Sequence, residues 1–256
     1  MATDKLEFLG PRGQKLSARL DSPNEPPRAY ALFAHCFTCG KDVVAASRIS
    51  LGLAAQGIAV LRFDFTGLGA SQGDFSDTNF STNSLDLIAA ADFLRTMYRA
   101  PSLIIGHSLG GAAVLASASR IPETRAVVTI GAPSDPAHVT AHFGPHLSHI
   151  DAHGEAMVNL AGREFKIKRQ FVVDAQGHRL TDSIPQLGRP LLVMHAPGDT
   201  TVGIENANVI FKAARHPKSF VSLDDADHLV TRKEDALYIA QVIAAWSLRY
   251  LPADEG

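Results

Sequence analysis

Ser108 lies in a run of glycine and small residues that is typical of an activated nucleophile. The run covers residues 106–111 (GHSLGG) and follows the apolar stretch Ser102–Ile105. This G-x-S-x-G pattern predicts a sharp strand-to-helix turn that exposes the serine hydroxyl, because the small flanking residues let the backbones approach. The amide of Leu109 would then lie at a helix N-terminus, where unpaired N–H groups favour a negative oxygen. A chance Gly/Ser turn is the alternative, and the strand before and helix after it favour the nucleophile.

A serine hydroxyl is a weak nucleophile, so it needs a general base and a third group that orients the base. In enzymes with this turn the chain order is serine, acid, histidine. Asp199 follows the apolar run Leu191–His195, and His228 follows the run Phe220–Leu223. Both therefore come just after strands, where sites collect in open α/β sheets. We predict a catalytic triad of Ser108, Asp199 and His228.

Two other aspartates are rivals for the acid. Asp225 and Asp227 stand beside His228 in the chain, too close to approach its ring easily from the far side. Residues of this type are more typical of turns and caps. The alternative for His228 is an exposed loop histidine bonded to a neighbouring aspartate, since the chain has 11 histidines. Two further histidines, His107 and His195, are expected to pack around the site.

The loop after the apolar run Ala29–Ala34 is expected to complete the site. It reads HCFTCGK over residues 35–41. In enzymes with this serine turn, the corresponding loop supplies a second amide to the developing oxyanion, and we predict that Phe37 does so. The amides of Phe37 and Leu109 would then face the same oxygen, where one such donor typically contributes about 2.7–4 kcal/mol.

Cys36 and Cys39 form a C-x-x-C pair within this loop. A redox pair is one interpretation, but the signal is weak. A zinc site would need two more ligands, and no second pair is present, although His35 and His107 could be near. Two small buried thiols that pack beside the serine turn are the favoured interpretation. We therefore predict no metal site.

A second glycine-rich stretch, Arg62–Ser71, also follows a predicted strand. A dinucleotide site is a poor interpretation of it, because the G-x-G-x-x-G pattern is incomplete and no ribose-binding acid follows on a further strand. A loop that borders the active site fits better. We therefore predict no cofactor.

Apolar runs alternate with helical repeats along the chain, which predicts a mostly parallel, doubly wound α/β sheet. Two runs that flank residues 10–13 predict an N-terminal antiparallel hairpin. The expected central strands are buried on both faces: Ala29–Ala34, Ile58–Phe63, Ser102–Ile105, Ala126–Ile130, Pro190–His195 and Ser219–Leu223.

The alternation breaks once, between Asp135 and Gly188. This stretch contains an alternating pair, Ala156–Leu160 and Phe165–Ile167, followed by a helical pattern. An ordinary crossover between strands needs far less chain. We predict a small cap inserted at 135–188 into a core made of 1–134 and 189–256.

The composition of the chain bears on whether it binds nucleic acid or membrane. The 256 residues are 46% hydrophobic and include 24 Lys and Arg against 26 Asp and Glu. This balance argues against a basic nucleic-acid surface, and the apolar fraction against a disordered chain. No apolar run approaches the roughly 20 residues that span a bilayer, and the first residues lack a signal-peptide pattern. We expect a cytoplasmic protein that binds neither nucleic acid nor membrane.

Taken together, these motifs resemble the α/β-hydrolase superfamily. The string HCFTCGKD at 35–42 is more narrowly similar to the hydrolase domain that precedes an OsmC-like domain in some bacterial bifunctional proteins. The resemblance covers nearly the whole chain and implies the same triad and the same two oxyanion amides. Many superfamily members have glycine after the loop histidine, where this chain has Cys36. A homo-oligomer, and an OsmC-like domain in fused relatives, are left open as partners.

The predicted function is hydrolysis of a small-molecule carboxylic ester by a serine hydrolase, through an acyl-enzyme. A peptidase or thioesterase on the same triad is an alternative, because specificity resides in the cap and pocket. A non-hydrolytic alternative is a redox or binding module that uses Cys36 and Cys39. Serine at the turn argues against dehalogenase and epoxide-hydrolase chemistry, because the resembling enzymes that perform these reactions have aspartate at this position.

Overall fold

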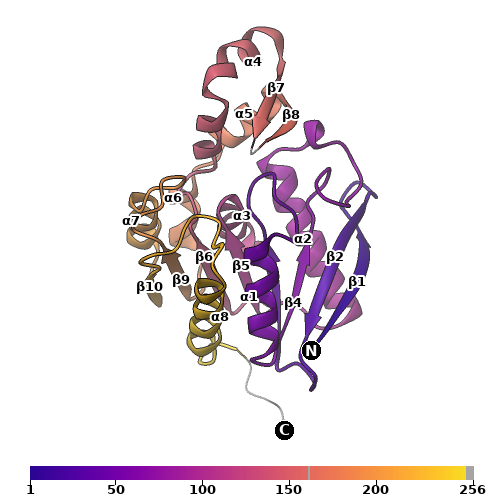
Figure 1. Cartoon of the computed structure of the whole chain (residues 1–256), viewed down its shortest axis with the longest axis vertical. Coiled ribbons are helices and arrows are strands. Elements are labelled where there is room, and N and C mark those ends of the chain that lie inside the picture. The colour runs from indigo at the N-terminus through magenta and orange to yellow at the C-terminus, as the bar shows by residue number, and fades with distance from the viewer. Residues whose placement is uncertain (161, 252–256) are drawn as a thin grey trace.

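The computed structural model describes residues 1–160 and 162–251. Eight strands form the main sheet, in the order β1-β2-β4-β3-β5-β6-β9-β10 (Figure 1). Strand β2 is antiparallel to both β1 and β4, and all pairs from β4 to β10 are parallel. The strands are β1 (Ala2–Leu9), β2 (Lys15–Ser22), β3 (Ala29–Ala34), β4 (Ile58–Phe63), β5 (Leu103–His107), β6 (Ala126–Ile130), β9 (Leu191–His195) and β10 (Lys218–Ser222).

Helices cover both faces of this sheet (Figure 1). One face packs against α1 (Val44–Ala54) and α8 (Lys233–Ser247), which contact each other. The other packs against α2 (Phe80–Met97), α3 (Leu109–Ser117) and α7 (Glu205–Ala213). Neighbouring residues of a central strand enter opposite cores, because side chains alternate along a strand. The predicted doubly wound α/β-hydrolase fold with an N-terminal hairpin is confirmed.

The last strand differs from its prediction. A strand buried on both faces was expected at Ser219–Leu223, but β10 is only half-buried, and the side chain of Phe220 is 43% exposed. The physical reason is its place at the edge of the sheet, where it pairs only with β9. An edge strand has no neighbour on its outer side, so an apolar run there does not require full burial.

The segment between β6 and β9 forms a lobe beyond one end of the main sheet over residues 136–177, and its last part returns to pack against α3 and α7 (Figure 1). Its strands β7 and β8 pair as an antiparallel hairpin, and a helix follows, as the sequence pattern predicts. The division of the chain at 135 and 188 stays a prediction. The elements of this segment are η3 (Pro136–His146), α4 (Leu147–His153), β7 (Glu155–Leu160), β8 (Arg163–Lys168), α5 (Arg169–Gly177), α6 (Leu180–Ser183) and η4 (Ile184–Gln186).

Two short 3-10 helices complete the described elements: η1 (Phe75–Asp77) before α2, and η2 (Ala118–Arg120) after α3. A capping box starts α2: the Asn79 side chain accepts from the Thr82 amide, and Thr82 Oγ1 accepts from the Asn79 amide. Such a reciprocal pair satisfies two donors that a helix start would otherwise leave unpaired. Across the described ranges, no helix combines the length and apolar character that crossing a bilayer requires.

Candidate active site

Ser108 occupies the turn between β5 and α3 in a conformation that side chains rarely adopt. Its φ is 55° and its ψ is −127°. The turn is so tight that its flanking positions, Gly106 and Gly110, have no room for a side chain. A Cβ on Gly106 would lie 2.2 Å from the Gly110 carbonyl oxygen, and one on Gly110 would lie 2.3 Å from the Ala34 carbonyl oxygen. The expected strand–serine–helix turn is therefore present, and its glycines are sterically required.

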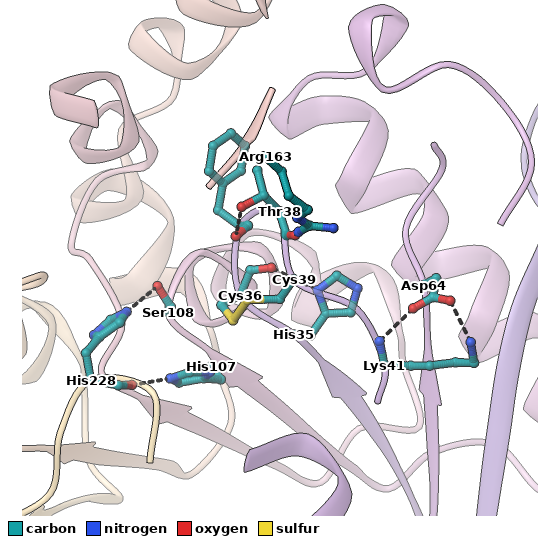
Figure 2. The surroundings of a disulfide bond; sticks show 11 residues. His35, Cys36, Thr38, Cys39, Lys41, Asp64, His107, Ser108, Arg163 and His228 are labelled. Carbon is teal, nitrogen blue, oxygen red and sulfur yellow. Dashed lines mark hydrogen bonds and ion pairs between the residues drawn. A yellow bond between two sulfur atoms is a disulfide. The ribbon is translucent and has the colours of Figure 1, made fainter. Parts of the chain in front are cut away.

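Three residues from the ends of three parallel strands meet at this turn. His228 Nε2 lies 2.9 Å from Ser108 Oγ, and His228 Nδ1 lies 2.7 Å from Asp199 Oδ2. Ser108 follows β5, Asp199 follows β9 and His228 follows β10. The contact between Ser108 and His228 is drawn in Figure 2. The structure thus brings the serine, the acid and the base of the sequence prediction together, within hydrogen-bond reach of one another.

The Asp199 carboxylate is held in its charged form. Burial favours the neutral acid, but hydrogen bonds from His228 and from the Val202 amide outweigh it and hold the pKa of Asp199 below its usual 3.8. Oδ1 accepts from the amides of Thr201 and Val202, at 2.8 and 2.9 Å. This leaves Oδ2 to accept from His228 Nδ1, which directs Nε2 toward the serine as a proton acceptor.

The rival Asp227 has a different partner. Its carboxylate accepts from the amide and the hydroxyl of Thr231. These bonds hold the turn before α8 and agree with the turn role expected from the sequence.

His107 and His195 support the loops around the site. His107 Nε2 lies 2.7 Å from the His228 carbonyl oxygen, and His195 Nε2 lies 2.7 Å from the Val202 carbonyl oxygen. Both side chains are buried. Burial, with the neighbouring charge of His228, lowers the pKa of His107 to about 4, so its ring is neutral at neutral pH.

The two residues of the predicted oxyanion site, Phe37 and Leu109, line one narrow cavity of about 10 Å³. Phe75 and Phe80 line it too, whereas the three triad residues do not. Within residues 1–160 and 162–251, neither the Phe37 amide nor the Leu109 amide donates a hydrogen bond to another group. Helix α3 and the end of β3 are in close contact here, since a Cβ on Gly110 would also lie 2.5 Å from the His35 carbonyl oxygen.

Cys36 and Cys39 are joined by a disulfide in this loop (Figure 2). The expectation of two buried free thiols is therefore wrong. The pair closes a four-residue turn in which the Cys39 amide donates to the Cys36 carbonyl at 3.2 Å. A turn brings its first and fourth residues near each other, and the Cα atoms here are 5.3 Å apart, an ordinary disulfide spacing.

Both ends of this loop are fixed to the core. At its start, buried His35 donates from Nδ1 to the Cys36 carbonyl, at 2.8 Å. At its end, the amide and the Nζ of Lys41 each donate to Asp64, both at 2.6 Å. Asp64 comes from the glycine-rich stretch after β4, which therefore borders the site as expected. This ion pair has no signal in the sequence, because no local pattern links residues 23 positions apart.

The lobe above the sheet also contacts the loop. The ring of Phe37 lies 6.0 Å from that of Phe143 and 5.4 Å from that of Phe171, both from the lobe. Arg163 of β8 donates to the Thr38 carbonyl (Figure 2). The segment predicted as a cap thus supports the residue that carries one of the two candidate oxyanion amides.

Comparisons with known proteins agree with this architecture. A solved structure, the esterase domain of a Rhodothermus marinus protein, is 51% identical to this chain, with a TM-score of 0.80. The match covers 98% of this chain and 100% of that one. Est1E from Butyrivibrio proteoclasticus, solved with ferulic acid bound, is 21% identical with a TM-score of 0.78 and covers 96% of this chain and 98% of its own. At that identity the likeness shows the fold alone.

Among curated proteins, the mitochondrial palmitoyl-protein thioesterase ABHD10 of Mus musculus is 26% identical over 187 residues. The match covers 70% of this chain and 62% of the mouse protein, so the chain spans less than two thirds of that relative's length. A family model described as "Alpha/beta hydrolase family" matches residues 31–241. With this match over most of its length, the chain belongs to the alpha/beta hydrolase family.

Proposed function

We propose that this protein is a serine hydrolase that cleaves carboxylic esters through an acyl-enzyme. The observation that carries the proposal is the pair of hydrogen bonds that links Ser108, His228 and Asp199, at 2.9 and 2.7 Å. Such a chain of nucleophile, base and orienting acid is the requirement for activating a serine hydroxyl.

In the proposed reaction, Ser108 Oγ attacks the ester carbonyl and His228 Nε2 takes its proton. The amides of Phe37 and Leu109 donate to the oxyanion of the tetrahedral intermediate. The imidazolium, stabilised by Asp199, then gives its proton to the departing alcohol and leaves an acyl-enzyme. Water activated by His228 attacks this second ester in the same way and releases the acid, which restores the free serine.

One comparison supports an ester substrate. The relative with 51% identity is an esterase domain. The mouse thioesterase relative supports the second candidate, cleavage of thioesters on the same residues.

The test is hydrolysis of p-nitrophenyl acetate, with fluorophosphonate labelling, by the protein and its Ser108→Ala variant. We expect labelling to disappear and kcat to fall by about 10⁶-fold, the loss typical of removing such a nucleophile. Ser119→Ala is the matched control, because Ser119 is exposed just beyond α3. Full activity in Ser108→Ala would overturn the proposal.

A panel of substrates then separates the candidates. The p-nitrophenyl esters of acetate, octanoate and palmitate are compared by kcat/KM. Each ester is also compared with an S-acyl thioester of equal chain length. Faster cleavage of the thioester would favour the thioesterase function instead.

A further inference from the structure

We propose that the disulfide between Cys36 and Cys39 positions the Phe37 amide, so that the hydrolase is active when oxidised and weakened when a dithiol opens the bond. The two cysteines are positioning residues for the oxyanion site, and the inference rests on the proposed function. It assigns a catalytic consequence to a loop that already lies against the nucleophile turn.

The link between the disulfide and the oxyanion amide is a single peptide plane. The Cys36 carbonyl and the Phe37 N–H belong to the same peptide, which is planar, so the direction of one determines the direction of the other. Two donors hold this carbonyl: His35 Nδ1 at 2.8 Å and the Cys39 amide at 3.2 Å. The second donor lies inside the ring that the disulfide closes. Keeping Cys39 close to Cys36 therefore keeps the Phe37 N–H aimed at the oxyanion position.

The turn needs this constraint because of Thr38. Its φ is +57°, in the left-handed region, where a β-branched residue is unfavourable. Glycine or asparagine is the usual residue at such a place in a turn. A covalent bond between Cys36 and Cys39 spans Thr38 and opposes its return to an ordinary conformation. Opening the bond would let Thr38 relax, rotate the preceding peptide and turn the Phe37 amide away.

The bond is open to attack from one side. Cys36 is 4% exposed, whereas Cys39 is half-buried. A thiolate of the dithiol would attack the Cys39 sulfur, and the Cys36 sulfur would leave as a thiolate and take up a proton. The second thiol of the reductant then attacks the mixed disulfide and releases Cys39. Two electrons and two protons pass to the protein, and the dithiol becomes a disulfide.

The loss on reduction is expected to be partial. Arg163 still holds the Thr38 carbonyl, and the Lys41–Asp64 pair still fixes the end of the loop. Removing one oxyanion donor outright costs about 10²–10³-fold in kcat, so we expect a fall of about 10- to 100-fold after reduction. KM should change little, because the oxyanion forms only in the transition state.

The experiment measures kcat and KM for p-nitrophenyl acetate on the full chain before and after dithiothreitol. Mass spectrometry after alkylation verifies that both thiols are free. We expect kcat to fall with the two thiols exposed and to recover on reoxidation. The Cys36→Ser/Cys39→Ser variant should have the low kcat permanently and show no response to dithiothreitol. Reduction of the unchanged protein tests the inference independently if that variant does not fold.

The Thr38→Gly variant tests whether the disulfide acts through the Thr38 conformation. If the disulfide only stabilised the fold, this substitution would not change the ratio of kcat between the oxidised and reduced forms. Glycine adopts a positive φ without the Thr38 penalty, so the oxidised and reduced forms of this variant should differ less in kcat than those of the parent protein. Equal kcat in the oxidised and fully reduced parent would overturn the inference while leaving the esterase proposal intact. An oxidised protein that neither hydrolyses the ester nor reacts with a fluorophosphonate would overturn both.

Discussion

His107 donates a hydrogen bond from Nε2 to the main-chain carbonyl of His228, at 2.7 Å. A carbonyl oxygen only accepts, so the proton is on Nε2, in agreement with the lowered pKa of this buried ring. The residue before the proposed nucleophile therefore holds the loop that carries the proposed base. Ser108 and His228 are connected through this support as well as through their side chains.

Removing the His107 donor should slow catalysis without altering substrate binding. His107→Phe keeps a ring in the buried position but leaves the His228 carbonyl without this partner. A net hydrogen bond is worth about 0.5–1.5 kcal/mol, so kcat should fall by up to about tenfold while KM stays unchanged. Steady-state kinetics checks this, with His149→Phe, an exposed histidine of α4, as the control. A change confined to KM would contradict the assignment.

The same histidine should make stability depend on pH. The pKa of His107 is about 4 when folded, because of burial, and near 6.5 when unfolded. Above pH 6.5 both states are neutral. As pH falls from 6.5 to 4, the unfolded chain binds a proton that the folded chain excludes, so about 3 kcal/mol of stability is lost. Urea unfolding at pH 7, 6 and 5 should show a shallower loss in His107→Phe. Equal slopes in the two proteins would refute this.

Asp199→Asn should abolish most activity while leaving the fold intact. The asparagine Oδ1 can still accept from the amides of Thr201 and Val202. Its Nδ2 cannot accept from His228, so the ring adopts the wrong tautomer and kcat should fall by about 10⁴-fold. Asp227→Asn is the control and tests the rival acid; we expect its kcat within a few-fold of the parent. The reverse pattern would assign the acid to Asp227.

Gly110→Ala should disrupt the nucleophile turn. The added Cβ would lie 2.3 Å from the Ala34 carbonyl oxygen, and backbone cannot move as a flexible side chain does. We expect a loss of about 1–3 kcal/mol in the free energy of unfolding, together with a large fall in kcat. Gly177→Ala, where nothing lies within 4 Å of the new Cβ, should be neutral. Calorimetry and ester hydrolysis on both variants measure the contrast.

The ring of Phe171 should matter to catalysis although it belongs to the lobe. Phe171 is 2% exposed and lies 5.4 Å from the Phe37 ring. Phe171→Ala should cost about 3–5 kcal/mol of stability and lower kcat, because the side chain beside the oxyanion amide loses its support. Val173→Ala on the same helix is the control, since Val173 is 59% exposed. Unchanged kcat in a folded Phe171→Ala protein would show that the lobe does not support catalysis through the oxyanion loop.

Much of the fold could be predicted because its signals are local. The strands Ala29–Ala34, Ile58–Phe63 and Ala126–Ile130 match their predicted bounds, since an apolar run between helical repeats suits a strand covered on both faces. The exposure of β10 could not be predicted, because the order of strands in the sheet decides which strand forms an edge.

The sequence alone determined the kinds of residue, their order and their positions after strands. This was enough to name Ser108, Asp199 and His228, because a strand-to-helix turn and a strand end are local features. Only the tertiary structure decided which distant groups support them. Arg163 contacts Thr38 across 125 positions, and Lys41 pairs with Asp64 across 23. Such contacts depend on how the packed elements meet, which no local periodicity records.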